Sequence, residues 1–213
     1  MNISDLARPW QICLEEAWAA YCAGSLPIGA CVVDAEGNIL SRGRNRINER
    51  VAEALYVCDN TLAHAELNAL LALAADRPTR RKAMLYTTTE PCPLCLGAFY
   101  MSGVRTLNYA AREPFAGSTN LLGTTPYLSR KPIKVIGPAE PELEGLVTAL
   151  AMEAELNFGR DPAIPVLQSW RQVIPAGAVL GERLHQSGEL RRMREEGWTA
   201  AQMVDALHAM LTS

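Results

Sequence analysis

Two short stretches, His64-Ala65-Glu66 and Pro91-Cys92-Pro93-Leu94-Cys95, decide how this sequence is interpreted. Together they supply one imidazole, two thiols and one carboxylate. An imidazole and two thiolates form a good three-ligand set for zinc, and a zinc ion with three protein ligands keeps a fourth position for water. The two stretches therefore predict a hydrolytic metal centre with a free carboxylate beside it.

The spacings support this assignment. Cys92 and Cys95 are three positions apart, so a helix would place both on one face, within reach of one ion. Pro93 suits the first turn of that helix, whose unpaired N–H groups and dipole favour thiolates. We therefore expect His64, Cys92 and Cys95 to bind Zn²⁺. Glu66, about 200° around its helix from the histidine, would hold the water and act as the catalytic acid/base.

A closed site is the alternative to this open one. Cys58 is the nearby candidate for a fourth ligand, and a four-ligand site would leave Glu66 without a role.

The pattern H-x-E followed by P-C-x-x-C is the signature of zinc nucleobase deaminases. The sequence resembles the cytidine and deoxycytidylate deaminase superfamily, in particular its tRNA adenosine deaminase and guanine deaminase branch, from about residue 6 to about residue 137. The segments 27–33, 43–46 and 102–105 match the flanks expected in that superfamily. The resemblance implies an α/β protein with a three-layer α/β/α cytidine-deaminase-like fold, a mixed five-stranded sheet and a C-terminal helical extension. It also implies a homodimer.

Further site residues are implied by the same resemblance. Asn45 matches an asparagine that binds the substrate's sugar or ring edge, although a turn-forming role is the alternative. Glu90 would bind N–H groups of a base or cap the cysteine helix. Ala65 and Pro91 match backbone that grips the amide edge of the base. Phe115 would stack on a flat ring or anchor its loop.

Composition bounds the remaining possibilities. The chain has 213 residues, of which 49% are hydrophobic and 20% charged, and this excludes a disordered protein. The net charge of −3 makes a nucleic-acid partner unlikely, because such binding depends on Lys and Arg. Arginine clusters at 42–50 and 77–82 are expected to be solvated. No signal peptide or apolar membrane span is evident, so the six cysteines indicate a reducing, cytoplasmic setting rather than disulfides.

Asp161-Pro162 and Ile164-Pro165 mark a boundary between residues 1–159 and a C-terminal helical extension, 160–213. The resemblance implies that residues 1–159 form the zinc-dependent deaminase domain. The extension is expected to pack on the core or on a second subunit, and Thr199 with Gln202 forms a capping-box pattern in it. Arg77-Pro78-Thr79-Arg80 is expected to be a break. Helices are predicted at 6–22, 63–75, 92–102 and 142–158, and strands at 28–33, 38–44, 83–89, 104–110 and 134–136.

The expected activity is hydrolytic removal of ammonia from a purine or pyrimidine base or nucleoside. A tRNA adenosine deaminase and a non-catalytic zinc-binding relative are the alternatives. The loops 47–62 and 111–131 would select the ring.

Overall fold

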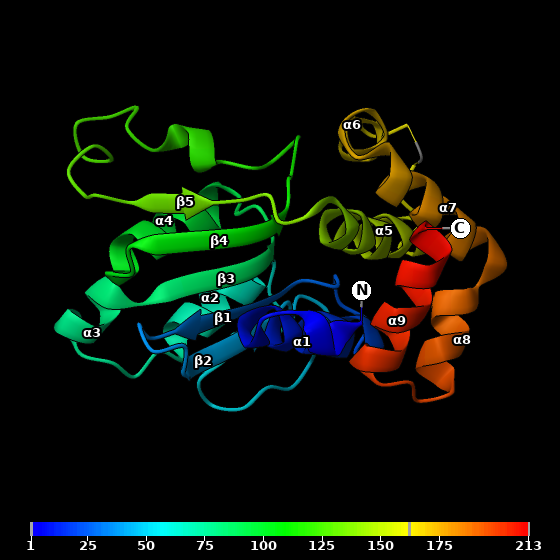
Figure 1. Cartoon of the computed structure of the whole chain (residues 1–213), viewed down its shortest axis with the longest axis horizontal. Helices are drawn as coiled ribbons and strands as arrows, with labels where there is room; N and C mark the ends of the chain where they lie inside the picture. The colour runs from blue at the N-terminus through cyan, green and yellow to red at the C-terminus, as the bar shows by residue number, and fades with distance from the viewer. Residues whose placement is uncertain (1, 162, 213) are drawn as a thin grey trace.

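The computed structural model describes residues 2–161 and 163–212, so Pro162 of the expected boundary lies outside the described residues. Five strands form one mixed sheet in the order β2-β1-β3-β4-β5, which confirms the predicted fold (Figure 1). Strand β1 is antiparallel to both its neighbours, and β3, β4 and β5 are parallel to one another. The strands are β1 (Gly29–Val33), β2 (Ile39–Arg44), β3 (Met84–Thr89), β4 (Thr106–Ala111) and β5 (Lys134–Ile136).

Helices cover both faces of the sheet, and strand β1 shows how. Cys31 and Val33 pack with helix α1 (Arg8–Cys22), while Ala30 and Val32 pack with helix α2 (Ala65–Leu71). Successive residues of a strand point to opposite faces, so α1 and α2 lie on opposite sides. Helix α4 (Pro93–Ser102) shares the α2 side, because Leu96 and Phe99 belong to the same core cluster.

Helix α2 lies directly on strand β2 because residue 43 is glycine. A Cβ atom built on Gly43 would lie 2.4 Å from Ala69 N and 2.7 Å from Ala65 O. Any side chain at this position would push the helix away. This close approach fixes the start of α2, where His64 stands.

One expectation from the sequence is wrong. Residues 77–80 do not form a break but open a short helix, α3 (Arg77–Lys82). Asp76 caps it by accepting a hydrogen bond from Thr79 N, and Pro78 stands in the first turn, where proline is tolerated. Helix α2 is also shorter than the predicted 63–75, because it begins at Ala65 and ends at Leu71.

The C-terminal extension is helical, as predicted, and packs on the core. Helix α5 (Pro141–Asn157) carries the chain away from the sheet to the remaining helices (Figure 1). One hydrophobic cluster joins Trp18 of α1, Leu146 of α5 and Leu207 of the last helix, and the predicted capping box at Thr199 is present. The extension contains α6 (Pro165–Val173), α7 (Pro175–Ser187), α8 (Glu189–Glu195) and α9 (Ala200–Leu211), and short 3-10 helices cover Ile3–Asp5 and Thr119–Leu121.

All six cysteines are free thiols. Within the described ranges, no helix combines the length and the apolar character needed to cross a membrane.

Candidate active site

Three potential metal ligands from two helix starts converge on one point. The ligand atoms of His64, Cys92 and Cys95 all lie within 4.8 Å of one another. His64 Nδ1 is 3.6 Å from Cys92 Sγ and 3.4 Å from Cys95 Sγ. A tetrahedral zinc ion with ordinary Zn–N and Zn–S bonds separates such atoms by about 3.6 Å, so the donor set fits zinc. Cys58 does not belong to this group among the described residues.

Local structure explains this convergence. His64 is the residue before α2 and has an extended backbone, with φ −76° and ψ 154°. Cys92 holds the same position before α4, with φ −68° and ψ 173°, and Cys95 follows in the first turn. Strand β3 ends at Thr89 and delivers the chain to this helix start. The thiols therefore face the positive end of α4, which stabilises thiolates.

The two thiols differ in acidity because they share a proton. Hydrogen bonds from Cys95 and His64 lower the pKa of Cys92 to about 4. The pKa of Cys95 is raised, because it keeps the shared proton beside Cys92 and is also buried. The hydrogen bond to Cys92 raises the pKa of His64. A metal cation would displace these protons, since metal ligands bind in their deprotonated forms.

Glu66 lies beside the three ligands. Its side chain is only 4% exposed, and its Oε2 lies 3.3 Å from Cys95 Sγ. Burial raises the pKa of the carboxyl. A carboxyl group of this kind holds a proton more readily than an exposed one and is suited to proton transfer.

A cavity of about 190 Å³ opens next to this group. Three residues of the metal-site motifs, His64, Glu66 and Cys92, line it, together with Glu90. One wall is apolar, and two further carboxylates, Glu113 and Glu155, face the space. The remaining lining residues are Leu26, Pro27, Ile28, Thr89, Ala116, Ala151, Val166 and Trp170.

Glu90 anchors the loop that follows β4. Its Oε1 accepts hydrogen bonds from the hydroxyl of Thr119 and from Thr119 N, and its Oε2 accepts one from Glu113 N. Gly117 permits this packing, because a Cβ atom there would lie 2.6 Å from Glu90 Oε2. The loop is therefore held against the start of α4, with Ser118 N donating to Pro91 O over 3.0 Å.

Trp170 of helix α6 is a cavity residue that sequence reasoning missed. It is 5% exposed and packs with Leu167 and Ala151. Its side chain hydrogen bonds to Glu113, whose carboxylate also accepts from Phe115 N and Ala116 N. Burial nevertheless raises the pKa of Glu113. Helical spacing indicates that Trp170 is buried, but nothing in the spacing indicates that it packs against the loop after β4.

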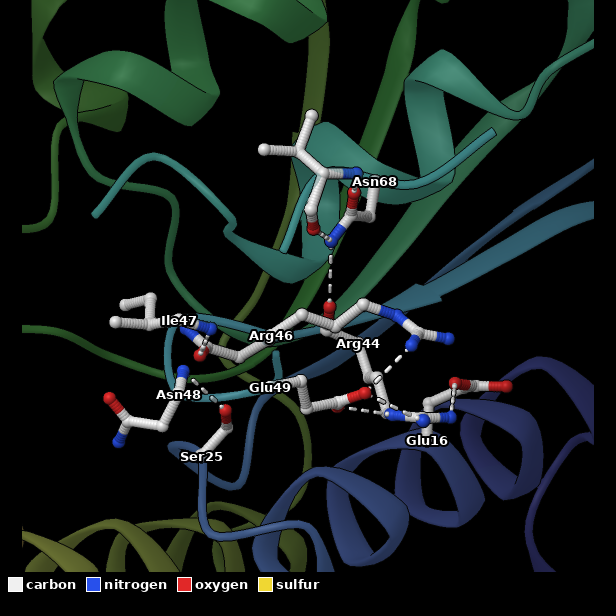
Figure 2. Close-up of polar contacts among 10 residues, drawn as sticks. Glu16, Ser25, Arg44, Arg46, Ile47, Asn48, Glu49 and Asn68 are labelled. Carbon is white, nitrogen blue, oxygen red and sulfur yellow. Dashed lines mark hydrogen bonds and ion pairs between the residues drawn. The ribbon is translucent and has the colours of Figure 1, made fainter. Parts of the chain in front are cut away.

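Asn45 is buried just after strand β2 and is 1% exposed. Its Oδ1 accepts a hydrogen bond from Ile47 N over 3.1 Å, whereas its amide nitrogen has no partner. The flanking residues Arg44 and Arg46 both donate to Glu49, and Figure 2 shows the three side chains pointing toward one another. Asn45 therefore sits in a clamped segment and has an unused donor.

A second contact holds the long connection that follows. The Asn68 side chain donates to Arg44 O and Val57 O and accepts from Val57 N, which ties residues 47–62 to helix α2 (Figure 2).

Of the expected substrate residues, Glu90 lines the cavity, whereas Asn45, Ala65, Pro91 and Phe115 do not. Ala65 and Pro91 are buried next to ligand residues. Phe115 is 61% exposed, so its ring points to solvent in this structure. The aromatic ring in the cavity wall is that of Trp170.

Comparison with known proteins identifies the class. The sequence model named "Cytidine and deoxycytidylate deaminase zinc-binding region" matches residues 4–111, just over half of the chain. The chain belongs to this family of zinc-dependent deaminases, and its cofactor is zinc.

Individual relatives act on different rings. The chain is 26% identical to a cytosine deaminase of Candida albicans over 158 residues, which cover 74% of this chain and 96% of that protein. It is 32% identical to a tRNA-specific adenosine deaminase of Bacillus subtilis, with 66% of this chain and 84% of that protein covered. A solved structure of a guanine deaminase from Nitrosomonas europaea matches with a TM-score of 0.54 and 27% identity, over 71% of this chain and 86% of that chain.

Proposed function

We propose that this protein hydrolyses the amino group of a purine or pyrimidine base or nucleoside and releases ammonia. The observation that carries the proposal is the lining of the cavity beside the metal ligands. It contains the carboxylates Glu66, Glu90, Glu113 and Glu155 and, among the described residues, neither lysine nor arginine. Such a cavity suits a flat heterocycle that presents N–H groups.

The roles of the site residues follow from their positions. His64, Cys92 and Cys95 would hold zinc, which, when bound, acts as a Lewis acid and lowers the pKa of a water molecule from about 15.7 toward 7. Glu66 would accept a proton from the attacking water at its carboxylate and deliver it to a ring nitrogen. It would then deliver the second proton to the departing ammonia. The bond between the ring carbon and the exocyclic nitrogen breaks and a C–O bond forms at the same carbon, so ammonia leaves and a carbonyl replaces the amino group while the ring stays intact.

Phosphate-bearing substrates fit this cavity poorly. A phosphate group is usually held by lysine, arginine or the start of a helix, and several uncompensated carboxylates repel it. Glu155 has an ion pair with Arg160, but Glu66, Glu90 and Glu113 have no arginine or lysine partner among the ion pairs of residues 2–161 and 163–212. This favours bases and nucleosides over nucleotides.

Two further contacts are assigned on separate observations, Trp170 because it lines the cavity and Asn45 because its buried amide nitrogen is unpaired, although Asn45 does not itself line the cavity. Trp170 would stack on the ring, since it supplies the aromatic part of the wall. Asn45 would use its unpaired amide N–H to bind a ring or sugar oxygen. The extension 160–213 would thus complete the deaminase domain 1–159 through α6.

A tRNA adenosine deaminase is the second candidate, favoured by the 32% identity to the Bacillus subtilis enzyme. It performs the same chemistry on a flipped nucleotide, which needs phosphate contacts around the mouth of the site.

Ammonia release from a panel of substrates separates the candidates. The panel contains cytosine, guanine and adenine, their nucleosides, the matching 5′-monophosphates and unmodified tRNA. The proposal predicts the highest kcat/KM for a base or nucleoside and at least tenfold lower kcat/KM for the matching monophosphate. Inosine formed in tRNA, with no turnover of free bases or nucleosides, would support the second candidate instead.

A further inference from the structure

A strongly basic cavity of about 360 Å³ lies at the far end of helix α4 from the metal ligands. Arg77, Arg80 and Arg81 of helix α3 line one side of it, and Arg105 and Lys131 line the other. This volume is in the range of about 300–1,000 Å³ that is typical of small-molecule sites. Five cations therefore converge on one space in a chain whose net charge is −3.

Among the described residues, these five cations have no carboxylate within ion-pair distance. None of them takes part in an ion pair among residues 2–161 and 163–212. The arginines in and just after strand β2 behave differently, since Arg42, Arg44 and Arg46 all pair with glutamates. Burial, and to a smaller extent the nearby charges of Arg105 and Arg130, lowers the pKa of Lys131.

Two of the cations, Arg80 and Lys131, have a structural role, but this role does not explain the charges of the other three. Arg80 donates to Leu73 O, Ala75 O and Ser102 O. Lys131 donates to Tyr100 O and lies 4.1 Å from the centre of the Tyr100 ring. Both therefore stabilise the end of α4, but a helix C-terminus carries only about half of one negative charge. The charges of Arg77, Arg81 and Arg105 remain uncompensated.

The cavity is separate from the catalytic site. Helix α4 carries Cys95 in its first turn, and its last residue, Ser102, lines the basic cavity. Cys92, at the start of this helix, and Ser102 are ten positions apart, which is about 15 Å along the helix axis and farther than the 5′-phosphate of a nucleotide bound beside Glu66 reaches. A ligand here would bind as a second molecule.

We propose that this cavity binds a small phosphate-bearing anion of at least two charges, such as a pyrophosphate or the phosphate chain of a free nucleotide. Arginine guanidinium groups from two sides match phosphate oxygens, which they bind through paired hydrogen bonds. The cations surround a confined space rather than following a stripe along the surface. This arrangement suits a compact anion better than a nucleic-acid backbone, which is bound along its length.

The test is calorimetric titration of the zinc-loaded full chain with pyrophosphate, with ATP and with a single-stranded RNA of 20 nucleotides. The test variant is Arg81→Gln/Arg105→Gln. The matched control is Arg191→Gln/Arg194→Gln, which removes the same charge from a different cavity. Arg81 is exposed and Arg105 is partly exposed and bonds only to its neighbour's carbonyl, so both variants are expected to fold.

We expect pyrophosphate or ATP to bind the wild-type protein. The affinity should fall at least tenfold in the test variant and stay unchanged in the control. Affinity should also fall as salt is added.

Three results would overturn the proposal. The first is no binding at millimolar pyrophosphate and ATP, and the second is an equal loss of affinity in the test variant and the control. The third is affinity that the test variant leaves unchanged, which would mean that the anion binds elsewhere, for example directly to zinc. If RNA bound more tightly than pyrophosphate and ATP, the proposal would be wrong, and the ligand of this cavity would be a nucleic acid.

Discussion

Glu66 and Cys95 meet across the starts of helices α2 and α4, with Glu66 Oε2 3.3 Å from Cys95 Sγ. Both side chains are nearly inaccessible, at 4% and 0% exposure. A carboxylate this close to a ligand sulfur lies beside any ion that the sulfur binds. The carboxylate proposed as the acid/base group and the proposed metal ligands are thereby held beside the cavity by two helix starts rather than by flexible loops.

Trp170 provides a test of the extension's part in the site. Replacing Trp170 with leucine keeps an apolar residue in α6 but removes the ring from the cavity wall. We expect KM for the preferred base or nucleoside to rise at least fivefold, because aromatic pairs contribute about 1 kcal/mol beyond burial. The measurement is steady-state ammonia release.

Leu167→Ala is the matched control, because Leu167 is on the same helix, is fully buried and does not line the cavity. It should lower the free energy of unfolding by about 2–5 kcal/mol without a comparable change in KM. If the two variants raise KM equally, α6 acts only through stability.

Glu49 tests the clamp around Asn45. Glu49→Gln removes the charge that pairs with Arg44 and Arg46 at 2.8 and 2.7 Å. We expect a loss of about 3 kcal/mol in the free energy of unfolding, because breaking a buried pair leaves uncompensated charge. We also expect KM to rise, because the segment that holds the Asn45 amide loosens.

Denaturant unfolding and steady-state kinetics check the clamp. Glu36→Gln is the control, since Glu36 is exposed and takes part in no ion pair among the described residues. Unchanged KM in a destabilised Glu49→Gln variant would show that Asn45 does not depend on the clamp.

Glu153 predicts a pH dependence of stability. It is 0% exposed, and Tyr21 and Asn157 donate hydrogen bonds to it. Burial raises its pKa above the ordinary value, and the hydrogen bonds from Tyr21 and Asn157, with the charges of Arg191 and Arg194, oppose this only in part. The folded protein therefore binds this proton more tightly than the unfolded chain does. The resulting stabilisation is present below about pH 4.5 and is lost as the pH rises through the folded pKa.

The measurement is the free energy of unfolding of wild type and Glu153→Gln between pH 4 and pH 8. As the pH rises, the free energy of unfolding of wild type should fall relative to that of Glu153→Gln, by about 1.4 kcal/mol for each unit by which the folded-state pKa is raised. A difference that is constant with pH would contradict a raised pKa at Glu153.

Metal removal distinguishes an open site from a closed one. Chelation of zinc should lower Tm, because the ion binds the folded protein and not the unfolded chain. Cys92→Ser should lose the metal, while Cys58→Ser should keep one equivalent, as measured by elemental analysis. Loss of zinc in Cys58→Ser would mean that the site has four protein ligands.

Much of the sheet and the metal centre could be predicted from sequence, because both depend on local patterns. The short apolar run at residues 29–33, which ends at the turn residues 34–37, and the spacing of Cys92 and Cys95 are local signals of a strand and of a shared helix face. Helix α3 was also within reach of sequence reasoning, since Asp76 followed by a proline two positions later is a helix-start signal that the expected break overlooked.

The cavity wall could not be predicted in the same way. Trp170 and Glu113 are 57 positions apart by their numbers, and their contact depends on how α5 and α6 return to the sheet. Hydrophobic periodicity shows which face of a helix is buried but not what it is buried against.

The most direct test of catalysis by Glu66 is ammonia release by wild type and Glu66→Gln on the preferred base or nucleoside, with zinc measured in both. The account predicts one equivalent of zinc in each protein and a kcat that falls by about 10²- to 10⁴-fold in the variant. A Glu66→Gln protein that retains zinc and turns over at the wild-type rate would contradict it.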